Sequence, residues 1–322
     1  MNPIPVGLIG VGRHGSRYLH HLLTEKTGGT LVAFSRINQT EGRRLAQTHR
    51  LQYYPQWRDL LADPSIRAVI VAAPPTLNVP IALEALHKGK ALLIEKPLAL
   101  TPLQAQHMVE TARQTGIPIM TAQTLRYEPV IQKLQELRAS LGDWQYLSCT
   151  MRAENRPKQL DGWGAYGVLM EFGIHLLDWI RFLTQDEVES VSAKMERPSP
   201  NDPECRVWGS LTTSQGLSCL VDISRVTQGR VTRVEIIGTR GQACADWIQH
   251  HVTVTREGNR VTDYPCPSIP TLIPVLQDFF HALDTNAPMS VTGEDGLQAV
   301  RIAEACYQSS QSGHPVLLAP PH

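Results

Sequence analysis

The chain has 322 residues, of which 42% are hydrophobic and 19% are charged, and its 30 basic residues balance 30 acidic ones. This composition excludes disordered and fibrous proteins, and the zero net charge provides no general attraction for nucleic acid or a membrane surface. The length allows two domains of ordinary size. The six cysteines are widely spaced, which predicts reduced, mostly buried thiols. With no secretory signal and no run of about twenty apolar residues, we expect a cytoplasmic protein.

The first part of the chain alternates short apolar runs with segments of helical period. We predict strands at Ile4–Ile9, Leu31–Ser35, Ala68–Ala73, Ala91–Ile94 and Ile117–Thr121. Helical segments between them include Val79–His87 and Leu103–Thr115. Alternating strands and helices are typical of a doubly wound parallel sheet with helices on both faces. The sequence therefore predicts an α/β Rossmann domain over residues 1–125.

The pattern changes near Arg126, where a second domain is predicted over residues 126–322. Helical periods occupy Glu128–Ser140, Val168–Leu183, Leu272–Leu283 and Gly296–Ser309. Between Val188 and Tyr264, polar and apolar residues alternate and turn signals separate the runs, which indicates an antiparallel meander. The second domain is therefore predicted to be α+β and to hold the substrate.

A GxGxxG motif, formed by Gly10, Gly12 and Gly15, follows the first strand and opens the first helix. Gly10 would allow the tight turn, Gly12 the close approach of a pyrophosphate, and Gly15 the packing of helix on strand. Arg13 and His14, inside the motif, are counted among the cofactor-binding residues. The alternative is a glycine turn that binds nothing.

Ser35 and Arg36 stand at the end of the second strand, where an NAD enzyme normally carries an acidic residue for the ribose. A guanidinium pairs with a 2′-phosphate, whereas a carboxylate would repel it. We therefore expect NADP in preference to NAD, with Ser35 and Arg36 as binding residues. The alternative is an ordinary surface arginine.

Glu95 and Lys96 follow the apolar strand in the segment LLIEKPLAL, at the edge of the sheet where doubly wound folds bind ligands. Lys96 is predicted to lie near the nicotinamide and to hydrogen-bond a substrate oxygen. A solvated loop lysine is the simpler alternative.

The apolar helix VLMEFGIHLLDWIRFL carries Glu171, His175 and Asp178, which helical spacing places on one face. Ionisable groups on such a helix need partners, and a cleft with a polar substrate supplies them. His175 is the expected general acid or base, oriented by a carboxylate one turn away. A buried network serving only stability is the main alternative. A metal site is disfavoured because no second histidine lies at ligand spacing, so we predict none.

With GxGxxG, EKP and the GxxxExGxHxxD run from Gly167 to Asp178 in this order, the chain resembles the glucose-fructose oxidoreductase and inositol dehydrogenase family, Gfo/Idh/MocA. The resemblance implies that Lys96 and His175 are catalytic, with Glu171 in the position usually held by an aspartate. It also implies a large open sheet in the second domain that makes homodimer or homotetramer contacts. Implied substrates are sugars, inositols, sugar nucleotides and other cyclic alcohols or ketones.

Two further positions depart from the family pattern. Asn78, in APPTLN, stands where many members have histidine, and Thr124 stands where many have asparagine. Arg126, with Tyr127 and Pro129 after it, matches the pattern. Pro74, Asn78, Glu95, Lys96 and Arg126 complete the predicted cofactor site.

The predicted reaction is reversible hydride transfer between nicotinamide and a carbinol or carbonyl carbon. His175 would exchange the hydroxyl proton, Lys96 would hold the oxygen, and Glu171 would orient the histidine or a neighbouring hydroxyl. Predicted substrate contacts, besides these three, are Asp178, Arg152, Trp163 and Tyr166. Two alternatives remain: a dinucleotide-binding regulator without turnover, and a reductase of an imine or conjugated double bond.

Overall fold

The computed structural model describes residues 3–155 and 166–320, which divide into two compact units. The first unit comprises Met1–Thr124 with Pro270–Val300, and the second comprises Leu125–Ile269 with Arg301–His322. Residues 270–300 thus count with the first unit although the second sheet precedes them in the chain. This grouping reflects close packing between distant segments. The ring of Phe280 lies so near Gly29 that a Cβ atom at Gly29 would be 2.2 Å from it.

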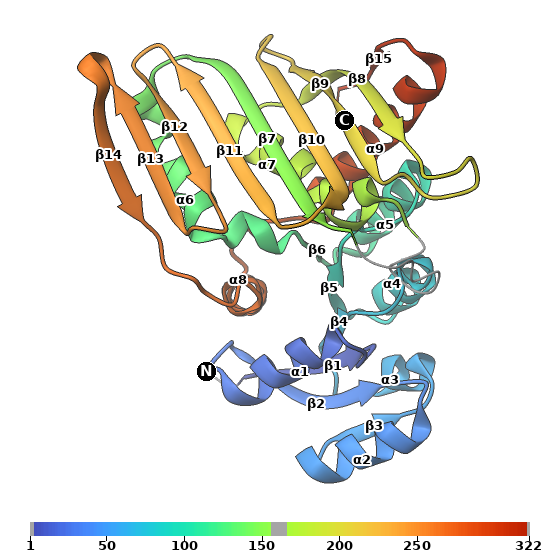
Figure 1. Ribbon diagram of the computed structural model, residues 1–322. Helices are drawn as coiled ribbons and strands as arrows, with labels where there is room; N and C mark the ends of the chain where they lie inside the picture. The colour runs from blue at the N-terminus through green and yellow to red at the C-terminus, as the bar shows by residue number, and fades with distance from the viewer. Residues whose placement is uncertain (1–2, 156–165, 321–322) are drawn as a thin grey trace. The chain divides into compact units, whose positions relative to one another are not determined.

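The first unit is built on a six-stranded parallel sheet in the order β3-β2-β1-β4-β5-β6 (Figure 1). Its strands are β1 (Ile4–Ile9), β2 (Gly29–Ser35), β3 (Gln52–Tyr54), β4 (Ala68–Val71), β5 (Ala91–Glu95) and β6 (Ile119–Ala122). Every side chain of β4 and β5 is buried, as expected for central strands of a parallel sheet. The strand order reverses between β1 and β4, which is where doubly wound folds bind ligands. The predicted parallel sheet is confirmed.

The first unit also contains helices, most of which connect its strands. They are α1 (Gly15–Thr24), α2 (Gln39–His49), α3 (Trp57–Ala62), α4 (Asn78–His87), α5 (Pro102–Thr115), α8 (Leu272–Thr285) and the start of α9 (Gly293–Ser312). Local sequence sets the ends of α5: Thr101 caps the backbone N–H of Gln104, Pro102 occupies the first turn, and Gly116 ends the helix at φ 69°.

The second unit contains a nine-stranded sheet in the order β14-β13-β12-β11-β7-β10-β9-β8-β15 (Figure 1). Its strands are β7 (Trp144–Glu154), β8 (Val188–Glu196), β9 (Arg206–Thr213), β10 (Ser218–Thr227), β11 (Val231–Gly238), β12 (Gly241–Asp246), β13 (His251–Arg256), β14 (Arg260–Pro265) and β15 (Val316–Leu317). The pair β7 and β10 is parallel, whereas the other neighbours that the structure describes are antiparallel. The predicted large, mainly antiparallel sheet is confirmed.

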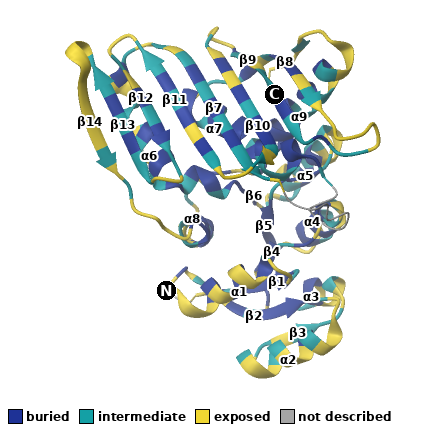
Figure 2. Cartoon of the chain, viewed as in Figure 1, coloured by how far each residue is buried: buried dark blue, intermediate teal, exposed yellow. Residues whose placement is uncertain are grey.

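One face of this sheet is covered by α6 (Pro129–Leu137) and α7 (Ile174–Thr184), whereas none of the described helices of this unit covers the other face (Figures 1 and 2). Along β7, the side chains of Leu147, Cys149 and Met151 are buried, and those between them are partly exposed. The uncovered face, which carries Arg152 and Asp222, is called the open face below. None of the described helices is long and apolar enough to span a membrane.

The segment predicted as one helix over Val168–Leu183 differs from a regular α-helix at its start. Residues Leu169–Gly173 form a π-helical turn, and α7 follows from Ile174 to Thr184. A π-turn has about one more residue per turn than an α-helix and often occurs at functional sites. Glu171 lies in the π-turn, and His175 lies in α7. The expectation that the two side chains share one helix face assumed regular α-helical spacing, which the π-turn does not have.

The six cysteines are free thiols within the described ranges. Cys149, Cys219 and Cys306 are buried, and the other three are partly exposed. Burial raises the pKa of Cys306 to about 12, so this thiol stays protonated near neutral pH.

Candidate active site

The glycine turn after β1 has the shape that a dinucleotide requires. Gly10 has φ 90°, and a Cβ atom there would lie 2.6 Å from the carbonyl oxygen of Ala72. A Cβ atom at Gly15 would lie 1.8 Å from the carbonyl oxygen of Gly10. Beside Gly12, in contrast, no heavy atom of the described residues other than Gly12 itself and its two chain neighbours lies within 4 Å of the Cβ position. The turn is therefore tightly packed on one side and open at Gly12, which fits a pyrophosphate at the start of α1.

Ser35 and Arg36 lie at the same turn. The backbone N–H of Gly10 donates to the carbonyl oxygen of Ser35 at 3.0 Å. The Arg36 guanidinium donates to the carbonyl oxygen of Val11, and the Tyr53 hydroxyl donates to the Arg36 carbonyl oxygen at 2.8 Å. Arg36 is thus held against the glycine turn by its side chain and its main chain.

Charge at the turn is predominantly basic. Arg13 is exposed and His14 is half-buried. Arg44, farther along in α2, is already paired with Glu41 at 2.6 Å on the surface. Arg13 and Arg36 therefore place positive charge at the turn, where it would attract an anionic cofactor.

Glu95, at the end of β5, is buried and receives two hydrogen bonds from the first helix. His14 Nε2 and the Tyr18 hydroxyl each lie 2.6 Å from its Oε1 atom. Burial alone would raise the pKa of the Glu95 carboxyl, but the charge of His14, the hydrogen bonds from His14 and Tyr18, and the charge of Lys96 together lower it. Glu95 is therefore an ionised group that joins the glycine turn to the strand preceding Lys96.

Asn78, the first residue of α4, holds the loop that contains Lys96. Its side chain is fully buried, and its Nδ2 atom donates to the carbonyl oxygens of Pro97 at 2.9 Å and Glu95 at 3.3 Å. The Lys96–Pro97 peptide is cis, and Lys96 itself is partly exposed. Pro74, also predicted for the cofactor, is exposed just before this helix. Asn78 therefore contacts the Lys96 loop from inside the protein.

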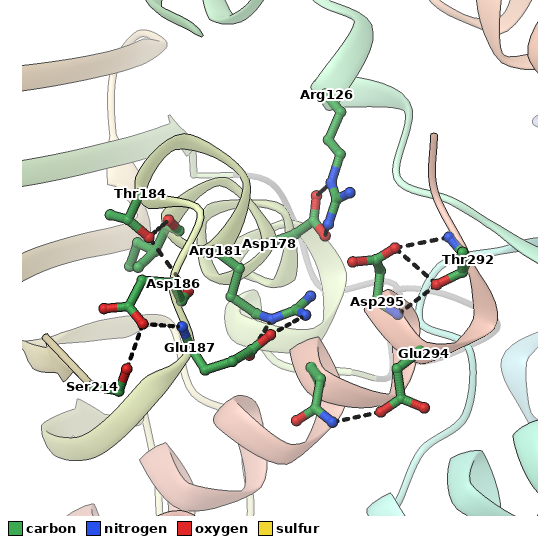
Figure 3. A network of polar contacts seen from close by, with 12 residues as sticks. Arg126, Asp178, Arg181, Thr184, Asp186, Glu187, Ser214, Thr292, Glu294 and Asp295 are labelled. Carbon is green, nitrogen blue, oxygen red and sulfur yellow. Dashed lines mark hydrogen bonds and ion pairs between the residues drawn. The ribbon is translucent and has the colours of Figure 1, made fainter. Parts of the chain in front are cut away.

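In the second unit, each predicted carboxylate has an arginine partner. Glu171 pairs with Arg225 of β10, and Asp178 pairs with Arg126 at 2.6 and 2.7 Å (Figure 3). His175, on α7 between the two carboxylates, is 7% exposed. The structure thus brings together Arg126, predicted for the cofactor, and Asp178, predicted for the substrate, as a buried ion pair.

The start of the π-turn is fixed by Glu204, which the sequence did not single out. Its buried carboxylate accepts from the backbone N–H of Leu169 at 3.1 Å and from the Tyr307 hydroxyl at 2.9 Å. A Cβ atom at Gly167 would lie within 2.0 Å of this carboxylate. Gly167, visible as the first residue of the GxxxExGxHxxD run, was the one local sign of such a contact. Tyr18 and Arg225 were also missed, because their partners are far away in the sequence.

The remaining predicted substrate residues are placed as follows. Arg152 lies on the open face, where its guanidinium pairs with Asp222, whereas α7 covers the opposite face. Tyr166 is partly buried, and burial raises its pKa. Trp163 lies outside the described residues. Among the residues that the structure describes, no group of three or more His, Cys, Asp or Glu side chains is arranged to hold a metal ion.

The sequence matches both parts of one family. Residues 4–123 match the model of an oxidoreductase family with an NAD-binding Rossmann fold, and residues 140–318 match the C-terminal alpha/beta domain of that family. The chain is 28% identical to the uncharacterized oxidoreductase YrbE of Bacillus subtilis, over 97% of this chain and 96% of the relative. It is 24% identical to the myo-inositol 2-dehydrogenase of Thermotoga maritima, over 97% and 98%.

Solved structures share the fold. An oxidoreductase from Agrobacterium radiobacter in complex with NAD+, L-tartaric acid and magnesium has a TM-score of 0.89 and 21% identity, with 98% of each chain covered. The UDP-N-acetylglucosamine 3-dehydrogenase GnnA from Acidithiobacillus ferrooxidans has a TM-score of 0.87 and 23% identity, with 97% of this chain and 99% of that chain covered.

Proposed function

The chain belongs to the Gfo/Idh/MocA family of oxidoreductases, and on that premise we propose that it interconverts a carbinol and a carbonyl group of a sugar, inositol or related cyclic polyol. Family membership makes it an NAD(P)-dependent dehydrogenase, as the sequence predicted. The observation that carries the proposal is the link from His14 in the glycine turn to Glu95 beside Lys96. This contact lies within the first unit and joins the glycine turn, where we propose that the dinucleotide binds, to the residue that precedes Lys96.

In this proposal, Gly10, Gly12, Arg13 and Arg36 hold the dinucleotide at the turn. When bound, the nicotinamide supplies or accepts the hydride that leaves or reaches the substrate carbon. Lys96 donates a hydrogen bond to the substrate oxygen and so stabilises negative charge that develops on it.

His175 is proposed to take the proton from that oxygen during oxidation and to return it during reduction. Glu171, held by Arg225, orients the histidine or an adjacent hydroxyl. Oxidation therefore removes a hydride from carbon and a proton from oxygen, and reduction restores both. Arg152, which is paired with Asp222 on the open face, is not among the substrate-binding residues proposed.

The substrate class rests on the relatives. Myo-inositol 2-dehydrogenase of Thermotoga maritima and scyllo-inositol 2-dehydrogenase (NAD+) of Bacillus subtilis are each 24% identical to this chain. A polyol ring offers the neighbouring hydroxyl groups that Glu171 and Lys96 can bind. We therefore propose inositols and sugars, with their ketones, as the first compounds to assay.

The cofactor proposed is NADP in preference to NAD. Ser35 carries no charge to repel a 2′-phosphate, and Arg36 is fixed at the turn through Val11. Titration with NADPH and NADH should show tighter binding of NADPH, and Arg36→Asp should move the preference toward NADH by about tenfold or more. Equal affinities of the unmodified protein for the two cofactors would overturn this preference.

We also propose a homodimer or homotetramer formed through the open face. That face exposes Leu220 and Val226 to 39% and 51%, although both side chains are apolar. Light scattering of the purified chain should give a mass of two or four subunits, and Leu220→Arg should reduce it. A monomer at micromolar concentration would contradict this arrangement.

Turnover is the test of the proposed reaction. Oxidation of NADPH should depend on a ketone from a panel of inosose and sugar ketones, and Lys96→Ala and His175→Ala should each lower kcat by about 100-fold or more. Lys194→Ala and His20→Ala are matched controls, because both side chains are exposed. Cofactor binding without turnover on any ketone would favour a regulator, and activity unchanged by His175→Gln would favour reduction of an imine or conjugated double bond.

A further inference from the structure

The Glu95 carboxylate is the point where the first helix meets the Lys96 loop. Its side chain is 3% exposed, and its Oε1 atom is shared by His14 Nε2 and the Tyr18 hydroxyl, each at 2.6 Å. Tyr18 is fully buried, whereas the side chain of His14 is 36% exposed. The contact therefore extends from the buried end of β5 to the partly exposed start of α1.

The Glu95 carboxylate is buried, and the charge of Lys96, the next residue, is among the influences that lower its pKa. The titratable groups that act on Glu95 are His14, Tyr18 and Lys96. Burial, and then the charge of Glu95, raise the pKa of Tyr18 well above its usual value, so the hydroxyl remains a donor. Two donors therefore partly offset the negative charge beside Lys96.

Asn78 fixes the main chain of the same loop independently of the Glu95 side chain. Its Nδ2 atom donates to the carbonyl oxygens of Glu95, Pro97 and Leu98, at 3.3, 2.9 and 3.4 Å. With the backbone held in this way, a change at His14 or Tyr18 acts mainly on the position and charge of the Glu95 carboxylate.

We propose that His14 and Tyr18 are positioning residues for the Lys96 site: by holding the Glu95 carboxylate in place next to Lys96, they set the electrostatic environment in which the Lys96 ammonium group acts. The catalytic consequence rests on the proposed function of Lys96. Because His14 belongs to the glycine turn, the same contact makes the Lys96 loop dependent on the turn that receives the dinucleotide.

The proton affinity of Lys96 can be measured without substrate. The full chain is labelled with [13Cε]lysine, its Lys96 resonance is assigned by comparison with Lys96→Arg, and the resonance is followed from pH 6 to 11. His14→Ala and Tyr18→Phe should each raise the pH at which Lys96 loses its proton by roughly half a unit or more, because the carboxylate charge is less offset. His14→Gln, whose amide can still donate to Oε1, should show a smaller change.

Two substitutions serve as matched controls. His20→Ala removes an exposed imidazole from the same helix, and Tyr54→Phe removes a hydroxyl that donates to Asp63 at 3.0 Å. Neither should move the Lys96 titration. If His14→Ala and Tyr18→Phe leave it at the value of the unmodified protein, the proposal is overturned, whatever happens to activity.

Turnover separates this proposal from the proposed function. His14→Ala and Tyr18→Phe should lower kcat for ketone reduction by more than they raise KM for the cofactor, with a shift in the pH profile of kcat. A shifted Lys96 titration in a protein that reduces no ketone would support the role of His14 and Tyr18 while contradicting the proposed function.

Discussion

Arg126 and Asp178 form a buried ion pair in which Nε and Nη2 of the guanidinium lie 2.7 and 2.6 Å from the two carboxylate oxygens (Figure 3). The pair joins the first residues of the second unit to α7, one turn after His175. A guanidinium that binds a carboxylate at two points has little freedom to rotate. Arg126 and Asp178 therefore fix the helix that carries the proposed proton-transfer residue.

Breaking this pair should be costly, because it leaves a buried charge without its partner. We expect Asp178→Ala to lower the free energy of unfolding by about 3–5 kcal/mol, measured by urea denaturation. Arg230→Ala removes an exposed partner of Glu154 in the same unit and should cost at most about 1 kcal/mol. If Asp178→Ala lowers the free energy of unfolding by no more than Arg230→Ala does, the Arg126–Asp178 pair does not fix α7 in the way described.

Glu128, which precedes α6, should make stability depend on pH. Burial raises the pKa of its carboxyl to about 7, against the smaller opposing effect of a hydrogen bond from Trp247. Between about pH 4.5 and pH 7 the folded state therefore keeps a proton on Glu128 that the unfolded state has released. Because the folded state binds more protons in this range, the free energy of unfolding decreases as pH rises toward 7. The loss amounts to at most about 3 kcal/mol.

Urea denaturation at pH 5 and pH 8 measures this dependence. In Glu128→Gln the decrease between the two pH values should be smaller than in the unmodified protein, while Glu136→Gln, at an exposed position of the same helix, should leave it unchanged. An identical decrease in Glu128→Gln and the unmodified protein would rule out Glu128 as its source.

Gly12 should be needed for the cofactor and dispensable for folding. The space beside it is empty, so Gly12→Ala should leave the melting temperature nearly unchanged. The added methyl group would occupy the space proposed for the pyrophosphate, and we expect NADPH to bind at least about tenfold more weakly by isothermal titration calorimetry. Gly229→Ala, where the Cβ position is also unobstructed, is the control and should bind NADPH normally. Normal binding by Gly12→Ala would place the cofactor elsewhere.

Asn78 should tolerate an apolar replacement better than an acidic one. Asn78→Ala removes the donor to the Pro97 carbonyl oxygen and should cost about 1–3 kcal/mol of unfolding free energy. Asn78→Asp would place a buried carboxyl group against carbonyl oxygens, so it should lower the free energy of unfolding by more than Asn78→Ala does. The difference between the two variants should grow above the pKa of the new aspartate, because the carboxyl group is then charged. Thermal unfolding at pH 8 ranks the two variants, and an Asp variant as stable as the Ala variant would be inconsistent with the observed contacts.

The sequence predicted the features that depend on neighbouring residues. Apolar runs defined β4 and β5, and the glycine spacing marked the turn before α1, because strand burial and turn geometry are set locally. The alternation of polar and apolar residues after Val188 likewise predicted the second sheet.

Contacts between distant segments were not predictable in this way. Arg225 is 54 residues from Glu171, and Tyr18 is 77 residues from Glu95. The π-turn at Leu169–Gly173 was missed because one extra residue per turn barely alters an apolar pattern. Asn78 also donates to the carbonyl oxygen of Pro97, 19 residues away, a contact that its sequence position did not indicate.

The most direct test of the central claim is transfer of the hydride itself. NADPH carrying deuterium at the transferred position of C4 is mixed with the full chain and each inosose or sugar ketone, and the product is analysed by NMR. We expect deuterium on the new carbinol carbon of at least one ketone, and strongly reduced transfer in Lys96→Ala and His175→Ala. A chain that binds NADPH but delivers no deuterium to any ketone, or delivers it equally well in both variants, would contradict the account.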